Sequence, residues 1–143
     1  MARYRRAREV VLQVLYGQEL NPDLGPQNNM ITERVKNDMD EERYAHRLLD
    51  GIHLGQADLD ARISAVLQNW KLERLAVTDR NVLRIGVFEL LYTSEPAAII
   101  INEAIEIAKE FGDKKSGGFV NAVLDKIRLN IEAERGRKAQ SEE

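Results

Sequence analysis

The residues at the start of the chain that could do chemistry are arginines. Residues 1–8 carry four arginines and no acidic residue, whereas the other 135 residues carry 17 Lys and Arg against 24 Asp and Glu. A guanidinium can donate two parallel hydrogen bonds to a phosphate, so this cluster indicates a local anion site on an acidic protein. The backbone of RNA or DNA is the commonest large anion. The alternative is a basic tail without a binding role.

A second candidate is an aromatic side chain on the same segment. Residues 3–20 contain no proline and repeat apolar residues at helical spacing, which predicts one amphipathic helix. Its buried stripe consists of Tyr4, Ala7, Val10, Val11, Val14 and Leu15, with Leu12 at the edge. Its opposite side carries Arg5, Arg6, Glu9, Gln13 and Tyr16. A tyrosine there offers a stacking surface to a base, unless it packs under a neighbouring helix or loop.

A third candidate precedes the last expected helix. The sequence Lys114-Lys115-Ser116-Gly117-Gly118 combines two cations with glycines that leave backbone amides free. Together with the positive end of a helix, this pattern is typical of a phosphate contact. The alternative is an ordinary flexible loop.

The sequence contains no complete set of catalytic residues and no complete set of metal ligands. His46 and His53 share a helix face, and Glu42 lies one turn before His46. A di-metal site in a helical bundle needs two Glu-x-x-His motifs and two further carboxylates, and one imperfect copy is present. The acidic pair Glu103 and Glu106 fits the start of a helix, where carboxylates oppose the helix dipole. We therefore expect no enzymatic activity, no metal and no cofactor.

The elements that must position these residues are expected to be helices. Asp40 is a candidate N-cap, Gly55 a candidate break, Thr78 a candidate N-cap, and Gly112 a candidate C′ residue. The stretch Ile99–Ile101 could be a strand, but no partner strand is evident. The sequence predicts an all-α bundle of six or seven helices. The expected helices cover residues 3–20, 40–54, 58–69, 78–91, 101–111 and 119–132, with an uncertain short one in 27–39.

The composition predicts one domain at residues 1–133 and a charged, disordered tail at 134–143. With 43% apolar and 31% charged residues, the chain has the composition of a globular protein. It has no cysteine, which suits a reducing cytoplasm, and no signal peptide pattern is visible. The longest apolar run, residues 96–101, is too short to span a bilayer, so no membrane contact is expected.

Four stretches of the sequence, in order and spacing, resemble the bacterial transcription antitermination factor family NusB. They are residues 5–9 with Gln13, Leu15 and Tyr16; residues 70–91; residues 101–109 with Phe111 and Gly112; and residues 119–126. The resemblance implies a fold of two packed helical bundles without enzymatic activity. Tyr4 departs from the pattern, since some relatives have another arginine there.

The resemblance also implies partners. Family members bind boxA, a short single-stranded RNA element of leader and ribosomal RNA transcripts, together with NusE, which is ribosomal protein ten of the small subunit. That complex joins RNA polymerase to suppress termination. The RNA-binding residues it implies here are Arg5, Arg6, Arg8, Tyr16, Lys114, Lys115 and Ser116. It places the NusE-facing surface near Asp79 and Glu89, and it implies that some relatives form a homodimer through the RNA-binding face.

Two other functions fit the residues. The chain could be a protein-interaction bundle or homodimer whose basic helix binds an acidic partner. It could also bind duplex DNA, although no helix-turn-helix pair with a basic second helix is evident.

Overall fold

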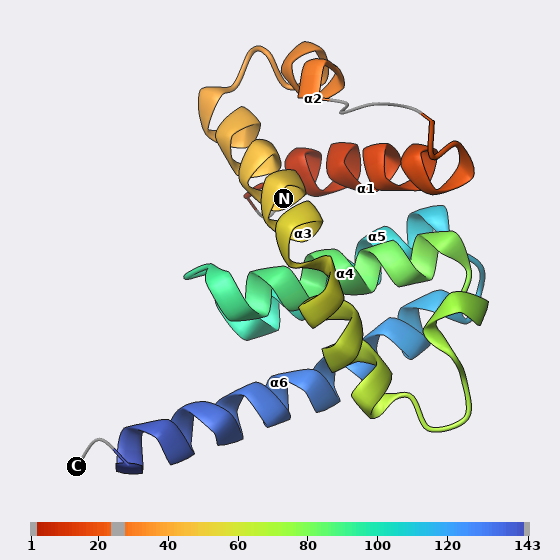
Figure 1. Ribbon diagram of the computed structural model, residues 1–143. Coiled ribbons are helices and arrows are strands. Elements are labelled where there is room, and N and C mark those ends of the chain that lie inside the picture. Colours follow the sequence, from red (N-terminus) through yellow and green to blue (C-terminus); the bar gives the residue numbers. More distant parts are fainter. Residues whose placement is uncertain (1–2, 24–27, 142–143) are drawn as a thin grey trace.

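The computed structural model describes residues 3–23 and 28–141 and forms helices connected by turns throughout that part of the chain (Figure 1). The prediction of an all-α fold with six or seven helices is confirmed. The elements are α1 (Arg5–Leu20), α2 (Asn28–Arg34), α3 (Met39–Val66), the 3₁₀ turn η1 (Leu72–Arg74), α4 (Val77–Tyr92), α5 (Ala97–Phe111) and α6 (Ser116–Ser141). No helix in the described ranges has the length and apolar character needed to cross a membrane.

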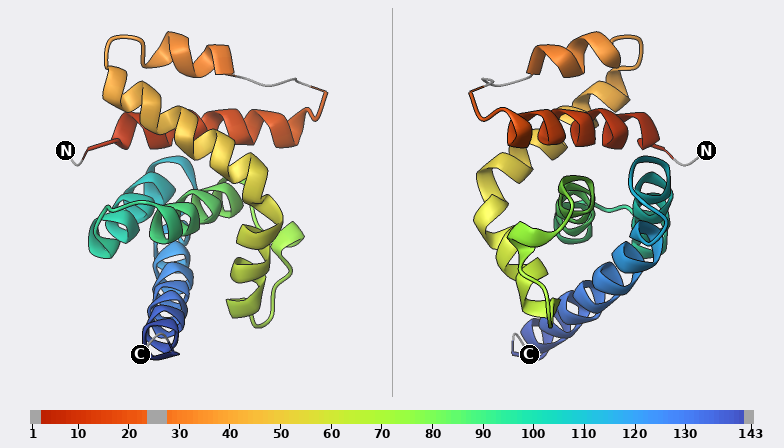
Figure 2. Two further views of the ribbon diagram at one scale, coloured as in Figure 1. Left: turned by 60° about the vertical axis from the view of Figure 1, so that its left-hand side comes forward. Right: turned by 90° about the vertical axis from the view of Figure 1, so that its right-hand side faces the viewer.

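The helices form two groups that share α3. Helices α1 and α2 pack with the first half of α3, while α4, α5 and α6 pack below them (Figures 1 and 2). Helix α4 contacts α1, α3, α5 and α6, and every residue from Asn81 to Leu90 is buried. The segment predicted as a helix at 78–91 therefore forms the centre of the fold. Helix α6 extends away from the body towards the C-terminus (Figure 2).

Helix α3 joins two segments that the sequence separated. Gly55 has non-helical angles of φ −107° and ψ 16°, so the predicted break is a kink inside one long helix. The N-cap is Asp38, which accepts a hydrogen bond from the Glu41 amide at 3.1 Å, and the prediction of Asp40 was therefore wrong. Asp38 caps the helix because its carboxylate reaches the third amide of the first turn, that of Glu41.

Two glycines allow α4 to approach its neighbours closely. A Cβ on Gly51 of α3 would lie 2.1 Å from Cε2 of Phe88, and one on Gly86 would lie 2.8 Å from Cδ1 of Leu124 in α6. Real Cβ contacts are longer than this, so a side chain at either position would force Phe88 or Leu124, or the helix that carries it, to move.

Several predicted helix ends differ from the structure. Helix α4 is capped by Ala76 without a side-chain hydrogen bond, so Thr78 lies inside the helix. Helix α5 begins directly after its N-cap Pro96, so Ile99 belongs to the first turn of the helix, where its amide donates to the Pro96 oxygen. Gly112 has φ −104°, so the left-handed C′ conformation expected for it is not adopted.

The last helix is longer than predicted at both ends. It begins at Ser116, so Gly117 and Gly118 belong to its first turn and not to a loop. It continues to Ser141, where the sequence predicted a disordered tail, although residues 132–141 are all exposed.

Candidate nucleic-acid interface

The first turn of α1 is fixed by residues of α3. Tyr4 has a positive φ of 69° and stacks on Tyr44, with ring centroids 3.8 Å apart and planes 6° apart. The Glu41 carboxylate accepts hydrogen bonds from the amides of Tyr4 and Ala7, both at 2.8 Å. These amides have no partner within their own helix, so α3 supplies the N-terminal cap of α1. The arginines that follow therefore leave the helix in fixed directions.

Arg8 points into the protein. Its side chain is 1% exposed, and its Nε and Nη2 donate to the equally buried Glu89 at 2.7 to 3.0 Å. Nη1 donates to the backbone oxygen of Arg3 at 2.7 Å, and Tyr44 donates its hydroxyl to Glu89. A buried charge needs such a complete set of partners. The expectation that Arg8 offers its guanidinium to a phosphate disagrees with this geometry.

Arg5 lies at the edge of the same network. Its Nε and Nη2 donate to the two carboxylate oxygens of Glu103 in α5, at 2.7 and 2.5 Å. This hydrogen bonding lowers the pKa of the Glu103 carboxyl, although burial acts in the opposite direction. Glu103 therefore stays charged at neutral pH, and it is an ion-pair partner of α1 rather than a helix-start acid.

Arg6 is the exposed member of the three arginines. Its side chain is 53% exposed, with Glu9 as a distant neighbour at 4.0 Å. Arg3, the first arginine of the basic cluster, is also exposed, and its Cζ lies 4.6 Å from the centroid of the Tyr4 ring. Burial, followed by the charge of Glu110, raises the pKa of Glu9 on this side of the helix.

Tyr16 lies on the surface, as the helical projection indicated. It is 42% exposed and lines a shallow hollow. The hollow is also lined by Leu12, Gln13, Thr78 and Phe111. Its ring is therefore accessible from solvent while α4 and α5 supply the neighbouring walls.

The loop after α5 presents its two lysines to solvent. Lys114 and Lys115 are exposed, and the Lys115 amide donates to the Asp113 carboxylate at 2.8 Å. Ser116 differs, because it is 2% exposed and its hydroxyl accepts a hydrogen bond from the Asp113 amide at 3.0 Å. The structure therefore offers the lysines, and not the serine, to a ligand.

The two residues expected to face a protein partner lie in different environments. Glu89 is buried in the ion-pair network with Arg8, so it is not part of a surface. Asp79 is partly exposed, and its Oδ1 is buried without a hydrogen-bond partner among the described residues.

The histidines are engaged with neighbouring side chains. His46 Nε2 lies 3.8 Å from Glu42, and His53 Nε2 lies 2.7 Å from the Gln18 oxygen. In the described ranges, no three His, Asp or Glu side chains are grouped to hold a metal ion.

A second ion-pair network joins the other end of α1 to α3 and α4. Glu19 accepts hydrogen bonds from Arg80, Asn81 and Arg84, and Arg84 also donates to Asp60 at 2.8 and 2.9 Å. Burial raises the pKa of Glu19, but the hydrogen bonds from Arg80 and Asn81 outweigh it and lower that pKa overall. Both ends of α1 are thus held by charges from distant helices.

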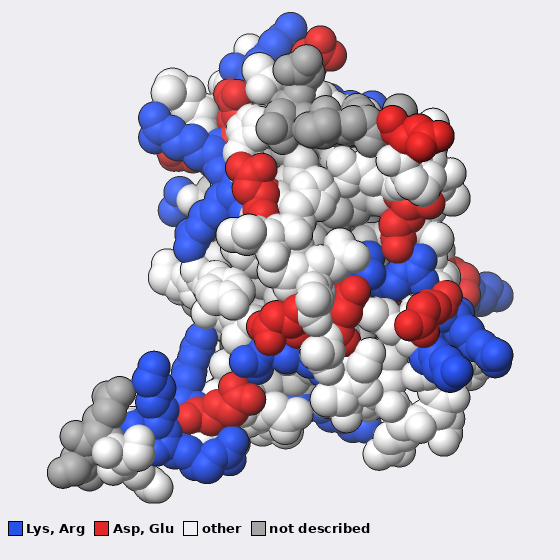
Figure 3. All heavy atoms as spheres, in the orientation of Figure 1, with Lys and Arg blue, Asp and Glu red and all other residues white. Residues whose placement is uncertain are grey.

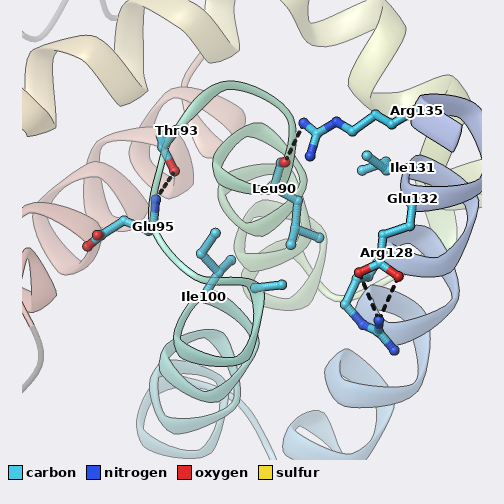
Figure 4. A pocket seen from close by; sticks show the side chains of 9 residues that line it. Leu90, Thr93, Glu95, Ile100, Arg128, Ile131, Glu132 and Arg135 are labelled. Carbon is cyan, nitrogen blue, oxygen red and sulfur yellow. Dashed lines mark hydrogen bonds and ion pairs between the residues drawn. The ribbon is translucent and has the colours of Figure 1, made fainter. Parts of the chain in front are cut away.

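Charge elsewhere on the surface is mixed. On the face drawn in Figure 3, Lys and Arg alternate with Asp and Glu. A pocket between the α4–α5 turn and α6 shows the same pairing (Figure 4): Arg128 donates to Glu132 at 3.0 Å, and Arg135 donates to the Leu90 oxygen at 3.2 Å. The Arg135 bond holds α6 against the end of α4, whereas Arg128 and Glu132 pair within α6.

The fold is all-helical, and its exposed cations include Arg6 of α1 and Lys114 and Lys115 of the loop after α5, which together are called the basic edge. Exposed cations on a small helical scaffold are typical of nucleic-acid-binding modules. The chain belongs to the NusB family, whose model matches residues 5–128. The resemblance found in the sequence is therefore confirmed.

Known relatives cover nearly the whole chain. The transcription antitermination protein NusB of Anaeromyxobacter dehalogenans is 41% identical over 96% of this chain and 99% of its own length. The solved NusB structure from T. maritima has a TM-score of 0.81 and 37% identity, covering 90% of this chain and 92% of that chain. A structure of NusB and NusE in complex with dsRNA has a TM-score of 0.78 and 30% identity, covering 91% and 99%.

Proposed function

We propose that this protein is a transcription antitermination factor that binds boxA-type single-stranded RNA together with NusE. The observation that carries the proposal is the family match over residues 5–128, with the similarity to a structure of NusB and NusE with RNA. It acts without enzymatic activity in the cytoplasm, as part of the complex that joins RNA polymerase.

The cations that are exposed and not held in a close ion pair are the ones proposed to contact RNA. Arg6, Lys114 and Lys115 are exposed and meet phosphates, and Arg3 lies at the same end of α1. Tyr16 supplies a ring for stacking. Arg8 and Ser116 support this face from below, because their polar groups are already bound within the protein.

The NusE contact is proposed near the start of α4. Asp79 is partly exposed at this end of α4, so its carboxylate can accept a hydrogen bond from a donor on another protein. Glu89 serves this contact indirectly, by fixing α1 against α4.

The test is a titration of a labelled boxA-type RNA with the full chain, alone and with NusE. The protein alone should bind modestly, because its free cations are few and its overall charge is negative. NusE should tighten binding, since a partner that extends the RNA surface adds contacts to those already made.

Equal affinity with and without NusE would contradict the antitermination role. Binding to a scrambled RNA or to duplex DNA as tight as binding to boxA would contradict the RNA preference. A stable homodimer that binds no RNA would instead favour a protein-interaction bundle whose basic helix pairs with an acidic partner.

A further inference from the structure

Glu103 occupies an unusual place for a carboxylate beside a basic edge. Its side chain is 4% exposed, and both of its oxygens accept hydrogen bonds from Arg5. A second guanidinium, that of Arg8, approaches the same carboxylate at 3.5 Å but is committed to Glu89. The charge of Arg5 is therefore compensated within the protein before any RNA arrives.

Arg5 still has one nitrogen to offer. Its Nη1 has no hydrogen-bond partner among the described residues, and it is not one of the buried unpaired atoms there. The side chain is 18% exposed, so the Nη1 edge reaches the surface while the other edge is held by Glu103. A bidentate pair fixes the plane of a guanidinium, which orients the free nitrogen.

We propose that Glu103 is a positioning residue of the RNA face, which holds Arg5 as an oriented but electrically neutral hydrogen-bond donor. This inference rests on the proposed RNA-binding function. The RNA receives a hydrogen bond from Arg5 Nη1 without a net ion pair, whereas Arg6, whose nearest carboxylate is 4.0 Å away, neutralises a phosphate. Arg5 and Arg6 are neighbours in the sequence with different physical roles.

The alternative is that Arg5 leaves Glu103 and pairs with a phosphate. That exchange would leave a nearly buried carboxylate without its two short hydrogen bonds, with only Arg8 Nη1 at 3.5 Å, and the Arg8 guanidinium already pairs with Glu89. A buried charge with so few donors is costly, so we infer that the Arg5–Glu103 pair persists in the complex.

Salt dependence distinguishes these two states of Arg5. Each phosphate that a protein cation neutralises on a single strand contributes about 0.7 to the slope of log affinity against log salt, because counterions are released. A neutral donor contributes to affinity but not to that slope. When the slopes of a variant and the wild type differ by about 0.7, the ratio of their affinities changes roughly threefold as the salt concentration rises fourfold.

The experiment measures binding of a fluorescent boxA-type RNA from low to moderate salt for four variants of the full chain. Glu103→Gln frees the Arg5 charge and should steepen the slope by about 0.7. The double variant Arg5→Gln with Glu103→Gln removes the neutral pair and should weaken binding while keeping the wild-type slope. Arg6→Gln should make the slope shallower by about 0.7. Glu106→Gln removes a partly exposed acid one turn along α5 that pairs with Lys109 and makes no hydrogen bond to Arg5; it is the matched control and should change the slope less than Glu103→Gln.

Two results would overturn the inference. One is a wild-type slope for Glu103→Gln; the other is a double variant whose slope falls as far as that of Arg6→Gln, which would mean that Arg5 exchanges partners. Thermal unfolding of each variant confirms that the protein measured is folded. If Glu103→Gln does not fold, the salt slopes of the double variant and of Arg6→Gln still show whether Arg5 exchanges partners. An Arg6→Gln variant with the wild-type salt slope would contradict the RNA site itself. That result would count against the proposed function and not against the role of Glu103.

Discussion

At the scale of single residues, the arginines of α1 show how a charge cluster divides into different roles. The sequence treated Arg5, Arg6 and Arg8 alike, yet one is buried, one is paired at the surface and one is exposed. The helical spacing of the sequence could have predicted that Arg8 is buried. At about 100° per residue, Arg8 falls between the buried Leu12 and Leu15, inside the apolar stripe. Glu89, which pairs with Arg8, and Glu103, which pairs with Arg5, are 81 and 98 residues away, so these pairs could not be predicted from local spacing.

Arg8 should be a stability residue. Arg8→Met leaves the Glu89 carboxylate buried without its main donors, and removal of one partner from such a pair costs about 3–5 kcal/mol. Arg6→Met, at an exposed position of the same turn, should change the free energy of unfolding by less than about 0.5 kcal/mol. Urea unfolding of both variants measures the difference. Similar midpoints for the two variants would show that Arg8 is not buried as a pair.

Tyr16 should be a binding residue. Tyr16→Ala removes a partly exposed ring, so we expect a loss of about 1–3 kcal/mol in RNA affinity with a nearly unchanged unfolding midpoint. Tyr16→Phe keeps the ring and should retain most of the affinity if stacking is the contact. A strongly destabilised Tyr16→Ala protein that binds RNA normally would mean that the ring serves packing instead.

At the scale of elements, apolar periodicity predicted which segments are helical but not where each helix ends. The central α4 and the buried stripe of α1 were correct, because burial repeats with the helix period. The caps were harder to predict. Helix α1 is capped by Glu41, which lies 37 residues from Tyr4, and α4 and α5 begin without any side-chain cap. Caps supplied by another helix leave no local signature.

Two glycines of different helices should respond oppositely to the same substitution. Gly51→Ala places a Cβ within 2.1 Å of Phe88 and should destabilise the protein by about 1–3 kcal/mol. Gly136→Ala, in an open stretch of α6 with no atom within 4 Å of the new Cβ, should stabilise it by about 0.5–1 kcal/mol. Thermal or urea unfolding tests both. Stabilisation by Gly51→Ala would contradict the close approach of α3 and α4.

The ion pairs that join α1 to the other helices should make stability sensitive to acid. The pKa values of Glu19 and Glu103 are lowered in the folded protein, so their contribution is present above the unfolded value of about 4.3. It is lost as the pH falls through the lower, folded pKa. The free energy of unfolding should therefore decrease from pH 6 to pH 3, and less steeply in Glu103→Gln. Equal pH dependence in the variant would show that Glu103 does not carry this effect.

At the scale of the whole molecule, a basic edge of a few residues sits on a chain whose net charge is −3. The separation of charge along the chain is visible in the sequence, because it depends on the positions of the charged residues. The sequence could not show that partnering acids reduce the effective charge of the edge, since that depends on how α4 and α5 pack against α1.

The outer part of α6 should be dispensable for the fold. Deleting residues 134–143 removes exposed helix, the Arg135 bonds to the end of α4 and the Arg62–Glu134 pair at 3.2 Å. We expect a cost of about 1 kcal/mol or less, since exposed pairs and single hydrogen bonds each contribute little. The unfolding midpoint of the shortened chain tests the predicted domain boundary at residue 133. Failure of that chain to fold would extend the domain to the end of α6.

The capping of α1 by α3, together with its ion pairs to α4 and α5, has a consequence for synthesis on the ribosome. The chain is made in the N- to C-terminal direction, so residues 3–8 emerge before α3, α4 and α5. At that moment Glu41, Glu89 and Glu103, which fix their positions, have not been translated. The start of α1 therefore acquires its final geometry only after these later helices have been made. A nascent chain shorter than about 100 residues carries the arginines but not the surface they belong to.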